Sequence, residues 1–314
     1  MKIFFATDIH GSNICFKKLL NAKKFYGVDI VILGGDMTGK MVVPIVKLNN
    51  GSYLSEILNQ AYTLKSKDEL GKFKENISNM GLYPYVTDND ELQVLQQDRG
   101  KADAIFKNLI LERFTEWVEL ADKKLADEKM NLFVCPGNDD DYYIDEILNQ
   151  SSSIINLENR VYDISPGYQI LSTGHSNPTP WHTPREISDD LLGNILENLA
   201  QEADQTKTAI YNIHVPPFNS KIDECAELDN ELQVKTSLGQ VKKKPVGSLA
   251  VRRAIEQYQP TLGLFGHVHE GKGVFNISGT LCINPGSNYQ EGVLNGCIVN
   301  LGQHLITGYQ FVTG

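Results

Sequence analysis

The sequence predicts an α/β protein with parallel strands. Two apolar segments, Lys2–Thr7 and Asp29–Leu33, flank a helical segment, and such a strand–helix–strand unit implies parallel strands joined by a right-handed crossover. Five apolar strands along the chain each end in Asp, His or Asn, usually beside Gly. The 314 residues suit one large α/β domain with an insertion, or two domains. That length can bury a sizeable core.

The first unit has readable helix boundaries. Ser12 or Asn13 can cap a helix that runs to about Phe25, and Gly27 lies just past its expected end. The second strand is closed by the sequence Gly34-Gly35-Asp36. These boundaries place Asp8 and His10 at the end of the first strand and Asp36 at the end of the second. In parallel sheets, ligands bind at these carboxyl ends of the strands.

The chain then departs from the α/β pattern. About 100 residues separate Asp36 from Asn138, which is more than one crossover needs. Lys40–Leu48 alternates weakly and suggests a hairpin arm, whereas the chain from about Leu54 to Leu125 is expected to be mostly helical. We interpret residues 40–127 as a mostly helical cap inserted in a single domain of residues 1–314. One amphipathic face of it contains Leu109, Phe114, Trp117, Val118, Leu120 and Ala121.

This insertion admits two functional readings, restriction of the substrate or formation of a dimer surface. A structural elaboration remote from the site is the alternative.

The α/β pattern returns after the insertion. Four strands are expected, at Asn131–Cys135, Tyr168–Ser172, Thr208–Ile213 and Thr261–Phe265, with helices at Ser188–Gln201 and Leu249–Tyr258. Short strands punctuated by Gly and Asn follow Gly273 and suggest hairpins that cover the end of a sheet.

Composition excludes several classes of protein. The formal net charge of −10 disfavours a partner that is a long nucleic acid, because an acidic surface repels polyanions. No run of 18 or more apolar residues is present, so no membrane partner is expected. The apolar N-terminal run is too short for a signal peptide. Five scattered cysteines without a C-x-x-C pair fit small buried side chains in a reduced compartment, so we expect a cytoplasmic protein.

The polar residues at the strand ends form one candidate metal site. Carboxylate and imidazole suit Mn, Fe or Zn, a carboxylate such as Asp36 can bridge two ions, and an asparagine supplies a neutral oxygen. Asp8 and His10 are two residues apart, so an extended backbone would place both on one side, and His267 and His269 repeat the spacing. The expected metal ligands are Asp8, His10, Asp36, Asn138, His214, His267 and His269.

These motifs, in this order, resemble the calcineurin-like metallophosphoesterase family, in a bacterial and archaeal phosphodiesterase-like branch. The resemblance extends from residue 1 to beyond 287 and rests on Asp8-Ile9-His10, Gly35-Asp36, Gly137-Asn138-Asp139-Asp140, His214 and Gly266-His267-Val268-His269. It implies a four-layer αββα sandwich, two mixed sheets flanked by helices with two metals at one end. By this resemblance the first metal is held by Asp8, His10, Asp36 and His269, and the second by Asp36, Asn138, His214 and His267.

The resemblance also implies the activity. A hydroxide bridging two divalent or trivalent metal ions would attack phosphorus, with Mn the ion expected to activate best. His214 would help neutralise charge on the phosphoryl group. The turn Asn284-Pro285-Gly286-Ser287 resembles one common in this branch. Asn138, Asn177 and Trp181 are expected to contact the substrate, the last two in a segment, Ser176–Trp181, that also resembles this branch.

One position departs from the family pattern. Family members commonly have His after Gly-Asn, as the acid that protonates the leaving group, but here that position is Asp139. A carboxylate near dications is a poor proton donor at neutral pH, so Asp139 as a plain turn residue is the alternative to a catalytic role. His175 lies just past a strand end and could substitute as the acid. His182 and His304 are expected to have no such role.

The sequence therefore predicts a dinuclear-metal-dependent hydrolase of a small phosphoester, with a phosphodiester preferred. A phosphatase acting on a small monoester, or a non-catalytic metal-binding scaffold for protein partners, are the alternatives. A homo-oligomer formed through the insertion also stays open.

Overall fold

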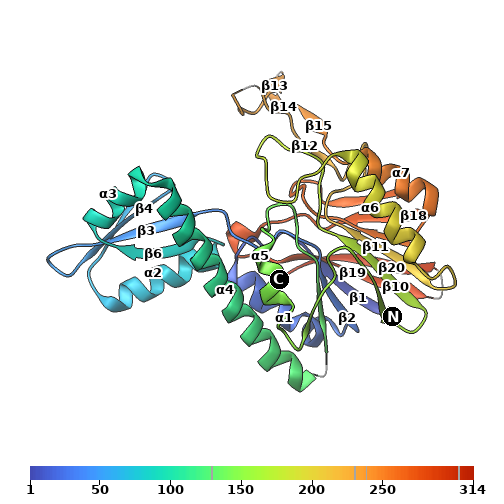
Figure 1. The fold of residues 1–314 in the computed structure, drawn as a ribbon, viewed down its shortest axis with the longest axis horizontal. Helices are drawn as coiled ribbons and strands as arrows, with labels where there is room; N and C mark the ends of the chain where they lie inside the picture. Colours follow the sequence, from blue (N-terminus) through green and yellow to red (C-terminus); the bar gives the residue numbers. More distant parts are fainter. Residues whose placement is uncertain (129, 230, 238, 303–304) are drawn as a thin grey trace.

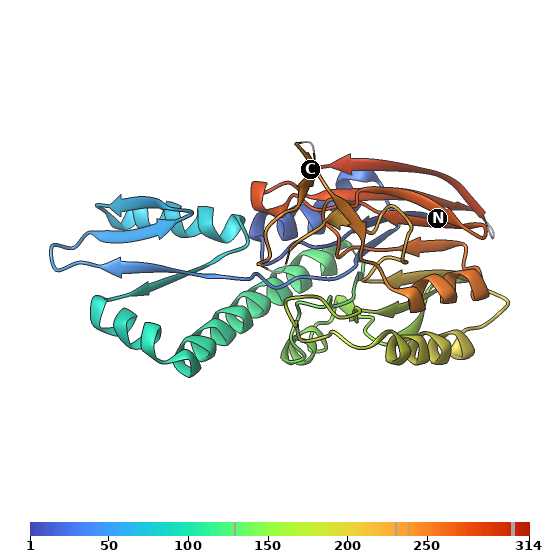
Figure 2. The ribbon, with the colours of Figure 1, turned by 90° about the horizontal axis from the view of Figure 1, so that it is seen from above.

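The computed structural model describes residues 1–314 except 129, 230, 238 and 303–304. Two six-stranded mixed sheets pack face to face and carry helices on their outer faces, so the predicted four-layer sandwich is confirmed (Figures 1 and 2). The strand order of the first sheet is β20 (Leu305–Thr313), β19 (Asn295–Gly302), β1 (Lys2–Ala6), β2 (Ile30–Leu33), β7 (Leu132–Val134) and β8 (Ile154–Asn156).

The second sheet has four parallel strands in its centre and an antiparallel strand at each edge. Its order is β17 (Gly273–Ile277), β18 (Thr280–Asn284), β16 (Leu262–Leu264), β11 (Thr208–Ile213), β10 (Tyr168–Thr173) and β9 (Arg160–Ser165). The strands after Gly273 do form hairpins, but these extend the sheets instead of covering an end: β19 pairs with β1, and β18 pairs with β16.

Alternation along the strands builds the layers. Phe5 and Ile32 face the second sheet and pack with Ile210 and Leu264, whereas Phe4 and its neighbours face the helices. The helices α1 (Asn13–Tyr26), α4 (Arg99–Glu128) and α5 (Tyr143–Leu148) cover the first sheet. The helices α6 (Asp189–Glu202) and α7 (Leu249–Tyr258) cover the second.

The inserted cap (residues 40–127) differs in part from the prediction. It contains three helices but also a four-stranded sheet with its own small core, whereas the sequence suggested only one hairpin arm. The sheet order is β5 (Gln60–Leu64), β4 (Tyr53–Ile57), β3 (Val42–Lys47) and β6 (Tyr83–Thr87). The cap's other helices are α2 (Lys67–Asn79) and α3 (Asn89–Gln97), and this α/β unit lies beside the sandwich, reached through the long helix α4 (Figure 1).

The amphipathic face of the cap packs on the sandwich. Phe114, Trp117, Val118 and Ala121 of α4 are buried in the same core as α1 and the first sheet, and the Trp117 ring stacks on Phe16. The predicted face therefore finds its partner within the chain.

A second projection is the arm (residues 224–245), which leaves the second sheet between β11 and α7 (Figure 1). It consists of two small ribbons, β12 (Glu224–Ala226) with β15 (Lys243–Pro245), and β13 (Thr236–Ser237) with β14 (Gln240–Val241). Among the residues that the structure describes, no helix combines the length and apolar content that crossing a bilayer requires.

Candidate metal centre

The carboxyl ends of strands from both sheets meet at one edge of the sandwich. Asp8 and His10 follow β1, Asp36 follows β2 and Asn138 follows β7, all in the first sheet. The second sheet contributes the remaining three side chains after β11 and β16, namely His214, His267 and His269. The structure thus brings all seven predicted ligands together at the edge where parallel strands end.

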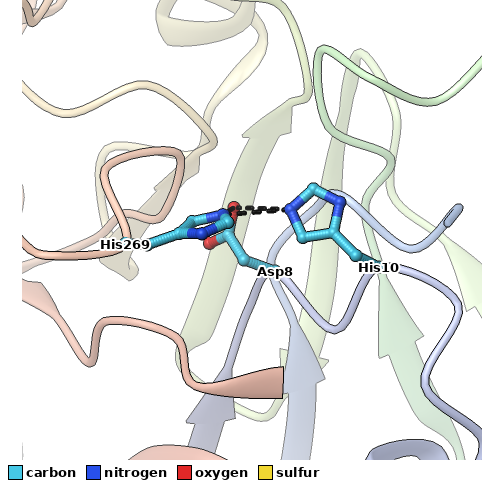
Figure 3. Close-up of side chains that lie close together, drawn as sticks. All are labelled: Asp8, His10 and His269. Carbon is cyan, nitrogen blue, oxygen red and sulfur yellow. Dashed lines mark hydrogen bonds and ion pairs between the residues drawn. The ribbon is translucent and has the colours of Figure 1, made fainter. Parts of the chain in front are cut away.

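The nitrogen and oxygen atoms form two groups. In the first, His269 Nε2 lies 3.5 Å from Asp8 Oδ1 and 3.0 Å from His10 Nε2, and Figure 3 shows the three side chains turned toward one another. In the second, Asp36, His214 and His267 offer atoms within 4.8 Å of one another. Asn138 Oδ1 joins this second group, 2.6 Å from His267 Nδ1.

Asp36 faces both groups through different oxygens. Its Oδ2 lies 3.6 Å from His10 Nε2, and its Oδ1 lies 3.3 Å from His214 Nε2. A carboxylate so placed is positioned to bridge two ions, as the sequence suggested for this residue.

The local backbone differs from the extended geometry that the sequence suggested. Asp8, His10, Asp36 and His267 have φ angles of 54°, 37°, 49° and 65°, in the left-handed region that side-chain-bearing residues rarely adopt. As a result, His267 and His269 contribute to different groups although they share the spacing of Asp8 and His10.

Hydrogen bonds hold this backbone in place. The amide of Asp8 donates to Gly35 O, that of His10 to Asp36 O, and that of Gly11 to Met37 O, which continues the β1–β2 pairing past the strand ends. The carboxylate of Asp140 accepts hydrogen bonds from the amides of Met37, Thr38 and Gly137 and so ties the loop after β2 to the loop after β7.

The turn at Asn284–Ser287 supports the loop of the second sheet. Asn284 Nδ2 donates to the carbonyls of Gly266 and Val268, and the amide of Ser287 donates to His269 O. Ser287 Oγ donates to Asp8 O, so the turn joins ligand loops of both sheets.

Electrostatics in the centre favour metal ligation. Burial opposes the charge of Asp8, but a hydrogen bond from His269 and the charge of His214 lower the pKa of Asp8 to about 2. Burial lowers the pKa of His10 to about 3, and burial with the charge of His214 lowers the pKa of His267 to about 4. Both imidazoles are therefore neutral, the form that binds a metal.

His214 behaves in the opposite way. Burial alone would lower its pKa, but the charge of Asp36 raises the pKa of His214 to about 10. Its Nδ1 lies 3.1 Å from Gly34 O, whereas its fully buried Nε2 has no hydrogen-bond partner within the described part of the chain. This buried nitrogen lies near the carboxylates of Asp8 and Asp36 but forms no hydrogen bond to the residues that the structure describes, and such an arrangement fits a cation-binding site.

Asp139 sits at the side of the centre. Its carboxylate forms an ion pair with Lys40 and lies 3.8 Å from His10 Nδ1, while its amide donates to Asp36 Oδ1. Burial and the charge of Asp36 raise the pKa of Asp139 to about 7, although Lys40 opposes the shift. Sequence reasoning missed Lys40, whose signal was its position four residues after Asp36.

His175 does not reach this centre, which corrects its suggested role as the acid. Its Nδ1 lies 3.2 Å from Glu158 Oε1, its Nε2 lies 3.3 Å from Tyr142 Oη, and it is not among the described residues that line the cavity at the metal centre. Glu158 also lies near the buried Arg185, whose Nε donates to Asp140 O. His175 thus belongs to a network that supports the Asn138 loop from behind. His182 lies exposed, and His304 lies outside the described residues.

Of the residues predicted to contact the substrate, Asn138 and Trp181 line the cavity and Asn177 does not. Trp181 lines the cavity at the metal centre and is 63% exposed, whereas Asn177 does not line it and donates to Val246 O. The cavity measures about 900 Å³ and includes Asn138, Asp139, His267 and His269 in its wall.

Comparisons with known proteins show the fold. No family model matches the chain. An uncharacterized protein of Methanocaldococcus jannaschii, MJ1162, is 27% identical over 179 residues, which cover 56% of this chain and 73% of that protein. One crystal structure aligns with 98% of each chain at 17% identity and a TM-score of 0.56. TT1561 of Thermus thermophilus aligns over 100% of this chain and 97% of its own at 13% identity, with a TM-score of 0.53.

Proposed function

We propose, from the calcineurin-like metallophosphoesterase fold that this chain has, that it is a metal-dependent phosphoesterase with two metal sites. One observation carries the proposal: Asp36 places one carboxylate oxygen near each of two donor groups, and each group contributes a histidine to the wall of one cavity. Such a pair of sites is the arrangement that hydrolytic enzymes use for phosphoryl transfer.

The donors fit divalent cations. His269, His10 and Asp8 would hold one ion, His214, His267 and Asn138 the other, and Asp36 would contact both. Nitrogen and carboxylate oxygen donors suit Mn, Fe or Zn. When bound, such ions supply Lewis acidity toward phosphoryl oxygens and make water nucleophilic at neutral pH.

The chain's own residues complete the site. The ammonium of Lys40 lines the cavity beside Asp139 and is positioned to bind a non-bridging or leaving oxygen. Thr183 Oγ1 accepts a hydrogen bond from Asn138 Nδ2, which fixes the amide so that its oxygen stays directed at His267. Buried supports of this kind keep the donors in place before the substrate arrives.

The metal assignment is tested with Asp36→Asn. Because Asp36 faces both donor groups, the variant should lose at least one of two bound ions and nearly all activity on an aryl phosphodiester, and chelation should abolish wild-type turnover until Mn²⁺ is restored. The measurements are metal content and kcat/KM. Asp29→Asn, an exchange at a carboxylate remote from the centre, is the control. Full activity in metal-free Asp36→Asn protein would refute the proposal.

We further propose that the enzyme prefers diesters to monoesters. The carboxylate of Asp139, in the form that Lys40 stabilises, stands beside the donors and repels a phosphomonoester of charge near −2 more than a diester of charge −1. At about 5–6 Å and an effective dielectric near 20, this repulsion is of order 3 kcal/mol per unit charge, as an upper bound that Lys40 reduces.

Two substitutions should move this preference in opposite directions. Asp139→His should raise kcat/KM for an aryl monoester relative to the matched diester by about tenfold, because a repulsive charge is replaced by a proton donor. Lys40→Met should lower the same ratio, since it removes a positive charge that attracts the monoester more strongly than the less charged diester. The measurement is kcat/KM for matched 4-nitrophenyl mono- and diesters. A wild-type enzyme that prefers the monoester, with both variants unchanged in ratio, would show that this pair does not set the preference.

A further inference from the structure

The cavity at the metal centre is much larger than a phosphoryl group requires. Its volume of about 900 Å³ lies within the range of about 300–1,000 Å³ that is typical of pockets for drug-sized ligands. The donors make up only part of its wall. Another part consists of Phe106 and Ile110 of α4, Tyr143 at the start of α5, and Trp181.

These apolar side chains are held in place. Ile110 is buried, and Phe106 packs edge-on against the Tyr83 ring at 5.6 Å. Lys107 Nζ lies over the Tyr143 ring, 4.7 Å from its centroid. This part of the wall is therefore formed by the inserted cap's own helix α4 together with α5.

Trp181 faces solvent from a fixed loop. The carboxylate of Glu186 accepts hydrogen bonds from the amides of Thr179 and Thr183 and from both their hydroxyls, and the amide of Trp181 donates to Thr179 Oγ1. An indole that is 63% exposed on such an ordered loop has no packing reason to be there. Its position in the cavity wall suits contact with a bound ligand.

We propose that the aromatic residues of this cavity wall bind a planar aromatic group carried by the phosphoester, of the nucleoside kind. The inference rests on the proposed function and names the substrate class. Three aromatic side chains favour a flat ring over an alkyl chain, because rings gain from stacked and edge-on contacts. Asp103, Asp141 and Glu270 also line the cavity, so hydroxyl or amino groups on the ligand would find acceptors, whereas a further anionic group would be repelled.

The test compares esters that share one leaving group. Thymidine 5′-(4-nitrophenyl) phosphate, hexyl 4-nitrophenyl phosphate and methyl 4-nitrophenyl phosphate release the same nitrophenolate, so differences in kcat/KM report on the retained group. We expect the thymidine ester to be preferred to the methyl ester by about tenfold or more, which is the gain from burying about one ring. Trp181→Ala should remove most of this preference while the methyl ester changes by less than about twofold.

Phe25→Ala is the matched control, since Phe25 is an exposed aromatic residue outside the cavity lining, and it should leave all three rates unchanged. A thymidine ester no better than the methyl ester, or a hexyl ester better than both, would overturn the inference while the phosphoesterase assignment stands. Equal losses for every ester in Trp181→Ala would also overturn it.

A binding measurement separates this inference from the proposed function. Thymidine 5′-monophosphate should quench the fluorescence of Trp181, and Trp181→Phe should abolish the change, because the second tryptophan, Trp117, is buried against Phe16. If no ester is hydrolysed but quenching is seen, the proposed function fails and the binding site stands. Absence of quenching with active enzyme counts against the binding site alone.

Discussion

At the scale of single residues, close packing around the donors explains why glycine precedes so many of them. A Cβ on Gly137 would lie 2.2 Å from Asp36 Oδ1, and a Cβ on Gly266 would lie 2.4 Å from Asp8 Oδ2. In both places the loop of one strand passes directly against the ligand of another. The glycines thus allow ligands from separate strands to approach one another, which a larger residue would prevent.

Gly137→Ala should therefore damage the centre without changing any donor. The new methyl group must push Asp36 aside, so we expect the affinity for metal to fall by at least about tenfold and the Tm of the metal-free protein to fall by a few degrees. Gly71→Ala is the matched exchange: Gly71 lies in α2, and apart from its chain neighbours and the backbone of its own helix no atom is within 4 Å of the position of a new Cβ. It should leave metal binding intact and stabilise the protein slightly. Metal titrations and melting curves decide between these outcomes.

The seven ligand positions could be predicted because each is a polar residue at the end of an apolar strand. Their backbone could not be predicted in the same way. The spacing of Asp8 and His10 suggests extended chain, whereas hydrogen bonds from neighbouring loops impose positive φ angles there. The position of Lys40 four residues after Asp36 did not reveal its ion pair either, since its partner Asp139 is 99 positions away in the chain and the contact depends on the fold.

At the scale of elements, helix α4 joins the cap to the ligand loops. Arg113 is buried within it and donates to Gly11 O, Ser78 Oγ and Leu82 O, and its guanidinium lies over the Tyr83 ring. Gly11 directly follows the donor His10. One side chain thus connects the first ligand loop to the corner between α2 and β6.

Arg113→Met should loosen this connection. It leaves the carbonyls of Gly11 and Leu82 without their charged donor, at a cost of about 2–4 kcal/mol of unfolding free energy. We expect the metal at Asp8, His10 and His269 to be lost before the one at His214 and His267, because Gly11 adjoins only the first group. Arg252→Met is the control, since Arg252 also donates to two carbonyls, those of Phe218 and Asn219, away from the centre. Urea unfolding and metal stoichiometry measure both effects, and equal retention of both ions would contradict the expectation.

Elements with strong terminal signals were predictable. The cap at Ser12 and the left-handed Gly27 bound α1, and Ser188 and Ser248 cap α6 and α7. The sheet of the inserted cap was not predictable, because β4 and β5 mix polar with apolar residues and the usual turn signal between them is missing. The turn between β4 and β5 is made by Leu58 and Asn59, both at positive φ, instead of the Asn-Gly pair that marks such hairpins.

At the scale of the whole molecule, buried thiols tie stability to alkaline pH. Cys297 lies between the two sheets and Cys282 between the second sheet and its helices, and burial raises the pKa of each to about 12 from an ordinary value of 9.0. The unfolded chain loses these protons from about pH 9, whereas the folded chain keeps them. Stability is therefore full below pH 9 and is lost as pH rises toward 12.

Each of these two thiols should contribute about 1.4 kcal/mol per pH unit to that loss. Urea unfolding at a series of pH values from 8 to 10.5 measures the slope. Cys297→Ala and Cys282→Ala should each make the slope shallower, whereas Val299→Ala, a buried residue without a titrating group, should lower stability equally at all pH values. A slope unaffected by either cysteine variant would show that other groups govern the alkaline transition.

The division of the donors between the two sheets has a consequence for how the protein is made. Asp8 and His10 leave the ribosome well before their partner His269, which lies 259 positions after His10, and the first donor group is complete only when β16 has joined its sheet. While the intervening residues are made, the growing chain holds only part of this donor group. On the proposed function, capture of metal therefore comes late in assembly, and a loaded molecule is one in which the two sheets have already closed on each other.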